Sequence, residues 1–324
     1  LTRLSPGDAY ALNAPYNGGT HLPDITVVSP VWIKGSCDIK FFVAARGHHT
    51  DVGGLTPGSM PPDSSNIMQE GVYIDNWKLV ESKKFREKET RELLSGALYP
   101  VRSLDINISD LKAQIAACEK GQRELQKMVD QYGWVKVKRY LKFIKENASK
   151  IVKTAICMMS DTSYVYPMDN DIDGEKRIIK ISVKIDKIAQ TATIDFTGTS
   201  AQLNSNYNAP SPVTKAAVLY AFRILAGGGI PMNSGVLEPL NIILPKGTML
   251  SPEFPAAVIA GNVETSQAVT SALLLAFGIQ AASQSTMNNV TWGNSNLQYY
   301  ETICGGTGAG IEFDGKPYNG TSGV

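Results

Sequence analysis

The chain has three histidines, and all of them lie in one short window, at His21, His48 and His49. Two of them open the same pattern, because Asp24 follows His21 and Asp51 follows His48 at the same spacing. Imidazole nitrogens and carboxylate oxygens are the donors that bind borderline divalent ions such as zinc, manganese or iron. Such an ion polarises a carbonyl or activates a water molecule. The pattern therefore predicts a metal site with four ligands: His21, Asp24, His48 and Asp51.

A β-hairpin is the element that would bring the two His-x-x-Asp patterns together. Residues 25–33 are rich in β-branched side chains, 39–45 form a second apolar run, and the turn-forming residues 34–36 separate them. One pattern precedes the first strand and the other follows the second, so an antiparallel pair places both at the same end. A lone histidine is more often a satisfied or solvated residue, and the convergence of two patterns argues against that alternative here.

The neighbour of His48 has a different predicted role. Successive residues of a strand face opposite sides, so His49 points away from the side that His48 occupies. We therefore rank His49 below His48 as a ligand and assign it, together with Asp51, to catalysis, to substrate contact or to support of the ligands.

Two further segments are candidate substrate-binding sites. Asn13 and Tyr16 flank the loop 17–20, whose glycines allow close approach to a ligand, although turn chemistry explains them equally well. Asn262 and Glu264 lie in a polar stretch before an expected helix, where free amides suit an anionic group. Capping of that helix by Thr265 or Ser266 is the alternative.

The C-terminal glycine-rich region shows no site for a nucleotide. Residues 310–316 match G-x-x-x-x-G-K, but Pro317 stands where a serine or threonine would bind magnesium. Cys304 precedes this region, and no histidine outside the early cluster is present to activate it. We interpret Cys304 as a packing residue rather than a nucleophile, and we expect this chain to bind no ATP.

The remaining patterns predict an α+β (mixed α/β) fold. Apolar residues at three- and four-residue spacing predict two helices on either side of Gly133, packed as an antiparallel helical hairpin. A second β-hairpin is expected at 179–185 and 192–196, and further helices at 212–226, capped by Ser211, and 265–280. The expected organisation is a β-rich metal-site part over 1–100, the helical hairpin over 101–160, and mixed helices and strands over 161–324.

Composition limits the class of protein. The net charge of +1 gives no electrostatic reason to expect nucleic acid or an anionic membrane as partner. Four separated cysteines favour a reducing, cytoplasmic compartment over a disulfide scaffold. No apolar run is long enough to span a bilayer. Neither end of the chain resembles a natural terminus, so we expect a longer polypeptide.

Several segments resemble the hydantoinase B/oxoprolinase family. The segments 13–24 and 46–54 resemble its N-D-P-Y-x-G-G-T-H-x-x-D motif and the signature that follows. The likeness extends over the whole chain through 57–62, 110–117, 195–200, 261–267 and 300–306. The double histidine at 48–49 resembles the oxoprolinase and hydantoinase branch. One departure is Ala14, which stands where the family usually has aspartate, and the family's region continues beyond residue 324 with a histidine-containing stretch.

The resemblance implies an ATP-dependent enzyme that opens a cyclic amide, most simply 5-oxoproline to give glutamate. A hydantoinase A-like ATPase, as a subunit or as a domain, would bind ATP and phosphorylate the substrate, in a homo- or hetero-oligomer. This chain would be the metal-bearing half. Alternatives within the family are hydrolysis of hydantoin or another lactam, or carboxylation of a ketone. A different alternative is a non-catalytic partner of the ATPase, with Ala14 marking a decayed site.

Overall fold

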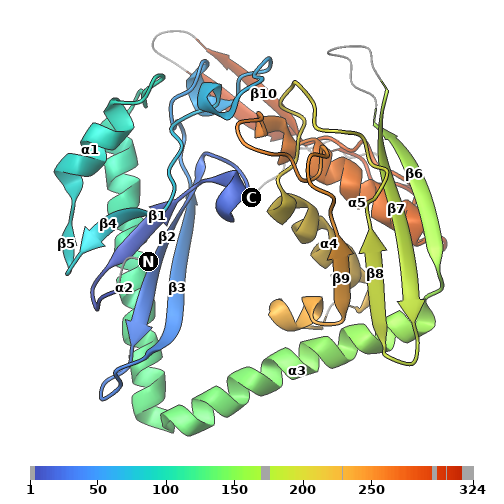
Figure 1. Ribbon diagram of the computed structural model, residues 1–324, viewed down its shortest axis with the longest axis horizontal. Helices are drawn as coiled ribbons and strands as arrows, with labels where there is room; N and C mark the ends of the chain where they lie inside the picture. The colour runs from blue at the N-terminus through green and yellow to red at the C-terminus, as the bar shows by residue number, and fades with distance from the viewer. Residues whose placement is uncertain (1–3, 169–175, 228, 294–297, 304, 316–324) are drawn as a thin grey trace. The chain divides into compact units, whose positions relative to one another are not determined.

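The computed structural model describes residues 4–168, 176–227, 229–293, 298–303 and 305–315. The chain folds as two compact units (Figure 1). Unit 1 comprises Leu1–Phe143 and two segments that return from later in the chain, Asn204–Asn206 and Phe254–Ile259. Unit 2 comprises the remaining residues. The boundary between the units lies after Phe143, whereas the sequence predicted divisions near residues 100 and 160.

Unit 1 is built on an antiparallel five-stranded sheet with the order β3-β2-β1-β4-β5. Its strands are β1 (Ala9–Leu12), β2 (Asp24–Trp32), β3 (Ile39–His48), β4 (Trp77–Glu81) and β5 (Lys84–Phe85). The β2–β3 pair confirms the predicted N-terminal hairpin and extends it to His48.

Helix α2 (Leu104–Tyr132) packs on one face of this sheet, against β2 and β3 (Figure 1). The alternation of β2 directs Ile25 and Val27 into a core that they share with Ile108 and Leu111 of α2. The side chains of the intervening strand residues point to the other face. A short helix, α1 (Glu87–Ser95), packs beside α2.

Unit 2 contains a four-stranded sheet with the order β6-β7-β8-β9. Its strands are β6 (Thr162–Met168), β7 (Arg177–Asp186), β8 (Thr191–Asp195) and β9 (Leu240–Ile243). The β7–β8 pair confirms the second predicted hairpin. Strands β8 and β9 are parallel, and α4 (Ser211–Leu225) makes the connection that such a pair requires. Both sheets together with the helices confirm the α+β class.

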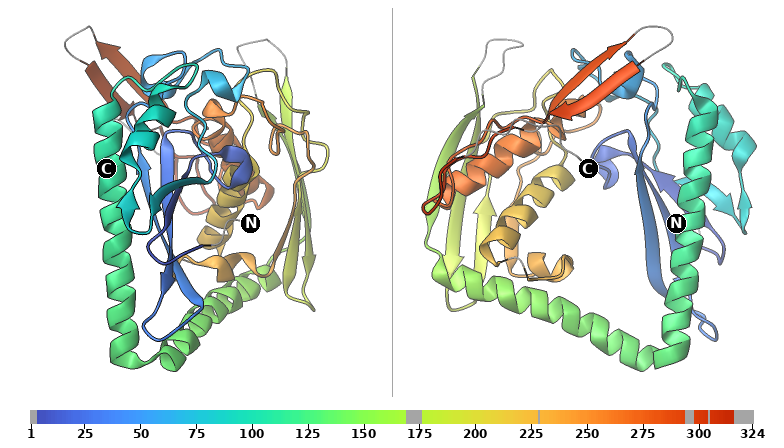
Figure 2. Two further views of the ribbon diagram at one scale, coloured as in Figure 1. Left: turned by 60° about the vertical axis from the view of Figure 1, so that its left-hand side comes forward. Right: turned by 180° about the vertical axis from the view of Figure 1, so that it is seen from behind.

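Helices α4 and α5 (Thr265–Ala276) pack against each other, and α5 also packs against β6 and β7 (Figure 2). A separate two-stranded ladder joins β10 (Asn288–Gly293) and β11 (Gln298–Ile303). The helix predicted at 265–280 ends early, because Gly278 has a φ of +66°. Ser211 is the first residue of α4 and does not cap it, since Pro210 holds the cap position.

The predicted helical hairpin is present as two helices, and their buried residues belong to different cores. Gly133 ends α2 as expected, and α3 (Trp134–Met158) follows at once. The buried positions of α2 between residues 108 and 118 belong to the core of unit 1. Ala148, Val152 and Ile156 of α3 belong to the core of unit 2. The apolar stripes therefore face different cores, and spacing along the chain did not distinguish this from mutual packing.

Among the residues that the structure describes, no helix is both long and apolar enough to cross a bilayer.

Candidate active site at the end of the first hairpin

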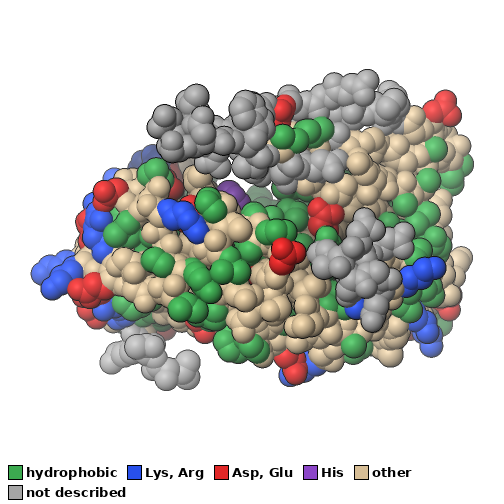
Figure 3. Space-filling model, turned by 90° about the horizontal axis from the view of Figure 1, so that it is seen from above, with side chains coloured by type: hydrophobic (Ala, Val, Ile, Leu, Met, Phe, Trp, Pro, Cys, Tyr) green, Lys and Arg blue, Asp and Glu red, His purple; other side chains and the backbone are tan. Residues whose placement is uncertain are grey.

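The hairpin places Asp24 and His48 directly opposite each other in the β2–β3 ladder. Opposite residues of an antiparallel pair point to the same face, which here is the face away from α2. Nδ1 of His48 lies 2.8 Å from Oδ1 of Asp24. The His48 side chain is exposed, and histidine surface is visible on the face drawn in Figure 3. The predicted convergence of the two patterns is therefore present for these two residues.

His21 completes the group from the loop before β2. Its ring stacks on that of His48, with centroids 5.5 Å apart and an interplanar angle of 14°. The residue is buried, and its Nδ1 has no hydrogen-bond partner among the described residues. Burial lowers the pKa of His21 to about 4, so the imidazole is neutral near pH 7 and both a lone pair and an N–H are present. A buried nitrogen without a hydrogen-bond partner is a feature expected of a residue that binds an ion or a ligand.

A divalent ion requires several nitrogen or oxygen donors around one point. Oδ1 of Asp24 and Nδ1 of His48 are joined by a hydrogen bond, so the remaining donors of the pair for an ion are Oδ2 of Asp24 and Nε2 of His48. The donor chemistry of His21, Asp24 and His48 also suits zinc, manganese or iron. In the described part of the chain, however, no three such side chains already surround one point as a complete ligand set. The donor types of the group therefore suit a metal, but in the described part of the chain its three side chains do not converge on one point.

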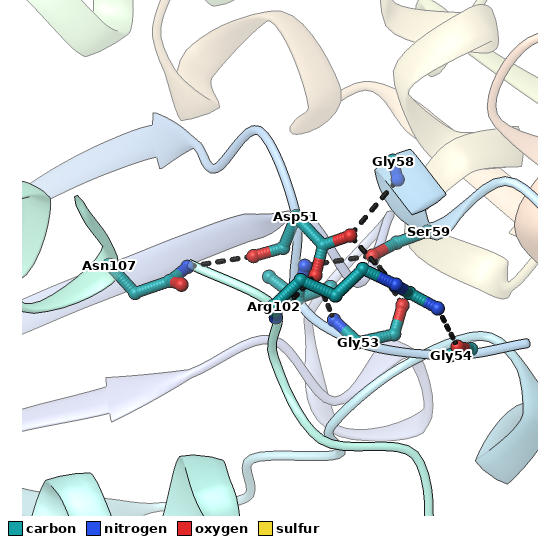
Figure 4. A network of polar contacts seen from close by, with 8 residues as sticks. Asp51, Gly53, Gly54, Gly58, Ser59, Arg102 and Asn107 are labelled. Carbon is teal, nitrogen blue, oxygen red and sulfur yellow. Dashed lines mark hydrogen bonds and ion pairs between the residues drawn. The ribbon is translucent and has the colours of Figure 1, made fainter. Parts of the chain in front are cut away.

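Asp51, predicted as a ligand and catalytic residue, makes its contacts away from this group. Its carboxylate accepts hydrogen bonds from the backbone N–H groups of Gly53, Gly58 and Arg102 (Figure 4). The Arg102 guanidinium donates to the same carboxylate over 2.8 Å and to the carbonyl of Gly54 over 2.7 Å. Both carboxylate oxygens are thus engaged, and Asp51 holds the loop after β3 in place.

His49 is buried on the α2 side of the hairpin, as the alternation predicted. Its Nε2 lies 3.1 Å from Oε1 of Gln114, and its Nδ1 lies 3.1 Å from Nδ2 of Asn107. Burial lowers the pKa of His49, which favours the neutral imidazole. His49 is therefore placed to support His48 from behind and not to contact substrate or metal.

Asn13 is a structural residue, which corrects its assignment to substrate binding. Its amide donates to the carbonyls of Leu22 and Val72 and accepts from the N–H of Ile74, and the side chain is fully buried. The amide oxygen could accept one further hydrogen bond, but the side chain has no exposed surface. Asn13 fixes the loop that carries His21.

The hydroxyl of Tyr16 donates to the carbonyl of Ala256, so Tyr16 holds a returning segment of unit 1. The glycines of the loop 17–20 were explained either by close approach to a ligand or by turn geometry, and at Gly19 the structure favours turn geometry. A Cβ atom there would lie 2.2 Å from the carbonyl oxygen of Asn13, so the turn itself requires glycine. Ala14 is the N-cap residue of the 3-10 helix Pro15–Asn17 and provides no side-chain cap. An aspartate at this position would be suited to capping.

Glu70 is a buried carboxylate that the sequence analysis did not single out. Its oxygens accept hydrogen bonds from the N–H groups of Val258 and Ile259 and from the hydroxyl of Ser64. Burial raises the pKa of Glu70 to about 7. This carboxylate fastens the segment Phe254–Ile259 into unit 1. No local pattern signals it, because its partners lie 188 and 189 residues away.

The other predicted site residues lie in unit 2. Glu264 is the N-cap residue of α5 and accepts a hydrogen bond from Thr286, while burial raises its pKa. Neither Thr265 nor Ser266 caps the helix, since their hydroxyls donate to backbone carbonyls. The side chain of Asn262 is partly exposed. Cys304, Lys316 and Pro317 lie outside the described residues.

The family model of hydantoinase B/oxoprolinase matches residues 1–322, and the chain belongs to this family. The chain is 43% identical over 315 residues to a 5-oxoprolinase of Dictyostelium discoideum, covering 95% of this chain and 24% of that protein. It is 43% identical over 340 residues to 5-oxoprolinase 1 of Arabidopsis thaliana, covering 99% and 26% of the two proteins. The chain thus spans about a quarter of the length of these relatives.

The fold resembles that of a solved ATP-dependent caprolactamase from Pseudomonas jessenii. The TM-score is 0.86 at 24% identity, and the match covers 98% of this chain and 57% of the other. At this identity, the likeness concerns the fold. The family expected from the sequence motifs is confirmed by the family model and by the sequence relatives.

Proposed function

We propose that this chain is the hydrolytic half of an ATP-dependent enzyme that opens a cyclic amide, with 5-oxoproline as substrate and glutamate as product. The observation that carries the proposal is the approach of His21, Asp24 and His48 at the open end of the first hairpin. The names of the relatives and the length that the chain lacks relative to them support the substrate and an ATPase partner. We assign ATP binding to that hydantoinase A-like partner.

The chemistry requires two kinds of help. Resonance makes a lactam carbonyl a poor electrophile, and phosphorylation of its oxygen by the partner would activate it. A water molecule then adds to the carbonyl carbon, the C–N bond breaks, and a second water molecule releases phosphate. Dividing the reaction in this way lowers each barrier that the hydrolytic half has to overcome.

His21, Asp24 and His48 are the residues that would hold a divalent ion. Such an ion supplies Lewis-acid polarisation of an oxygen atom. The chain's own contribution is the placement of the donors. The neutral His21 offers a ring nitrogen, Nδ1, that has no hydrogen-bond partner among the described residues, and the carboxylate of Asp24 fixes the orientation of the His48 ring. The exposed edge of that ring leaves it accessible to water and to substrate.

Arg46 supplies positive charge beside this group. It lies two residues before His48 on β3 and therefore on the same face of the sheet. Its guanidinium donates to the hydroxyls of Thr26 over 2.8 Å and Thr20 over 3.4 Å, and its charge helps to lower the pKa of the Asp24 carboxyl. A guanidinium suits a carboxylate or a phosphate, and 5-oxoproline carries the first while its activated form adds the second.

The test uses the complete enzyme with its ATPase part, assayed for 5-oxoproline opening and for ATP hydrolysis. We expect stoichiometric zinc, manganese or iron by elemental analysis, loss of ring opening on chelation, and recovery when the metal is restored. His48→Ala should abolish ring opening while ATP hydrolysis persists in part. Full ring opening by H48A, or by enzyme shown to be free of metal, would overturn the proposal.

A further inference from the structure

The buried face of α2 carries a polar residue that the apolar pattern does not explain. Gln114 lies between Leu111 and Cys118 on the helix, on the face that packs against the sheet, and only 7% of it is exposed. Burial of an amide costs free energy unless its hydrogen bonds are made. Its contacts therefore indicate what the amide does at this position.

Gln114 bonds to both strands of the hairpin. Its Nε2 donates to the carbonyl of Ile25 over 2.7 Å and to the carbonyl of Ala45 over 2.9 Å. Ile25 belongs to β2 and immediately follows Asp24, and Ala45 belongs to β3. The amide also packs against Gly47, where a Cβ atom would lie in van der Waals contact with it at 3.4 Å. One side chain of α2 thus joins the helix to both strands beside the site.

These two bonds also determine the orientation of the amide. Only the NH₂ group can face two carbonyls, so Oε1 faces His49 and must accept a hydrogen bond from its Nε2–H. Nδ1 of His49 then accepts from Asn107, whose amide also donates to the carbonyl of Asp51 over 2.8 Å. The imidazole of His49 is thereby held as one tautomer between two residues of α2.

The backbone continues this support up to the site. The N–H of His49 donates to the carbonyl of Pro23 over 2.8 Å, just beyond the opposed pair Asp24 and His48. The pair therefore lies between two braced positions, Ile25 on one strand and His49 on the other. A slip of one residue would turn His48 toward α2 and remove it from Asp24.

We propose that Gln114 is a positioning residue, which holds the register and direction in which His48 faces Asp24 and His21. The inference rests on the proposed function of that group. Gln114 lies on the opposite face of the sheet from His48, so it acts through the strand backbone and through His49 and contacts neither substrate nor metal. Its loss should therefore lower metal affinity and kcat, and should leave KM nearly unchanged.

The test is Gln114→Met in the complete enzyme, which keeps the length of the side chain and removes the amide. The matched control is Gln126→Met, because Oε1 of Gln126 accepts the N–H of Lys34 over 2.8 Å and also joins α2 to the hairpin, at its far end. We expect Q114M to lose roughly 10–100-fold in affinity for the added divalent metal and in kcat, with KM within about twofold of the unmodified enzyme. Q126M should match the unmodified enzyme in all three.

Metal affinity is measured by titration of the ion alone and expressed per folded enzyme, with the folded fraction taken from unfolding curves. Equal metal affinity and kcat in Q114M and Q126M would overturn the inference, and H48A would still report on the proposed function separately. If Q114M does not fold, Gln114→Leu, which also removes the amide, takes its place. A Q114L enzyme with unchanged metal affinity and kcat per folded molecule would likewise overturn the inference.

Discussion

Oδ1 of Asp24 and Nδ1 of His48 lie 2.8 Å apart because the two residues are directly opposed in the β2–β3 ladder. The contact follows from strand register, and each side chain needs only an ordinary extended backbone to make it. Since the register runs without a shift from Asp24 to Val31, the pair is set before any ligand binds.

Replacement of Asp24 by asparagine should test this relationship. D24N keeps the shape of the side chain and an oxygen that can accept from His48, but it removes the negative charge. We expect metal affinity to fall at least tenfold and ring opening by roughly 10²–10⁴-fold, with stability changed by less than about 1 kcal/mol. Metal titration, turnover and denaturant unfolding measure the three quantities. An enzyme with unchanged turnover would show that the carboxylate charge has no part in the reaction.

Asp51 should behave as a structural residue. D51A leaves the Arg102 guanidinium and several backbone N–H groups without their acceptor, so the free energy of unfolding should fall by about 2–3 kcal/mol. The metal bound per folded molecule should not change, because Asp51 lies outside the proposed ligand set. Loss of metal at full stability would restore Asp51 to the ligands.

Arg46 should govern substrate binding more than the chemical step. R46Q removes the positive charge on the face that carries His48, and we expect KM for 5-oxoproline to rise roughly 10–100-fold, as for loss of a charge-assisted hydrogen bond. R46K keeps the positive charge but lacks the planar guanidinium. Its KM should therefore lie between those of the unmodified enzyme and R46Q. Steady-state kinetics at saturating ATP gives the comparison. A change in kcat with KM unaltered would contradict a binding role.

Glu70 should make stability depend on pH. The pKa of this carboxyl is about 7 in the folded chain, above the ordinary value of 4.5. Between these values the folded state holds a proton that the unfolded state releases, so the free energy of unfolding falls as pH rises through this window. The contribution is fully present below the unfolded pKa and is lost above the folded pKa.

The variant E70Q provides the reference for this effect. Oε1 of Glu70 accepts from Val258, Ile259 and Ser64, and a glutamine oxygen can keep these bonds, whereas its NH₂ group loses the bond that Oε2 accepts from the Val258 N–H. The stability of the unmodified protein relative to E70Q should decrease by about 1–3 kcal/mol between pH 4.5 and pH 7. Chemical denaturation at a series of pH values measures it, and a constant difference would show that Glu70 does not titrate there.

Local pattern was sufficient for the centre of the site. The β-branched run, the intervening turn and the second apolar run predicted the hairpin, and the period of a strand predicted opposite directions for His48 and His49. These features depend on neighbours in the sequence, so they are readable without a tertiary structure. The family motifs covered the rest of the chain in the same way.

The tertiary structure decided which polar residues serve the site and which serve the fold. Asp51 has the spacing of a ligand, yet it is taken up by Arg102, which lies 51 residues later. Gln114 interrupts an apolar stripe without any local signal of its partners on two strands. Glu70 depends on backbone groups that are nearly two hundred residues away. Hydrogen-bond partners so distant in the chain are set by tertiary packing. Hydrophobic periodicity and motif spacing report only on residues that are close in the sequence, so they do not reveal such partners.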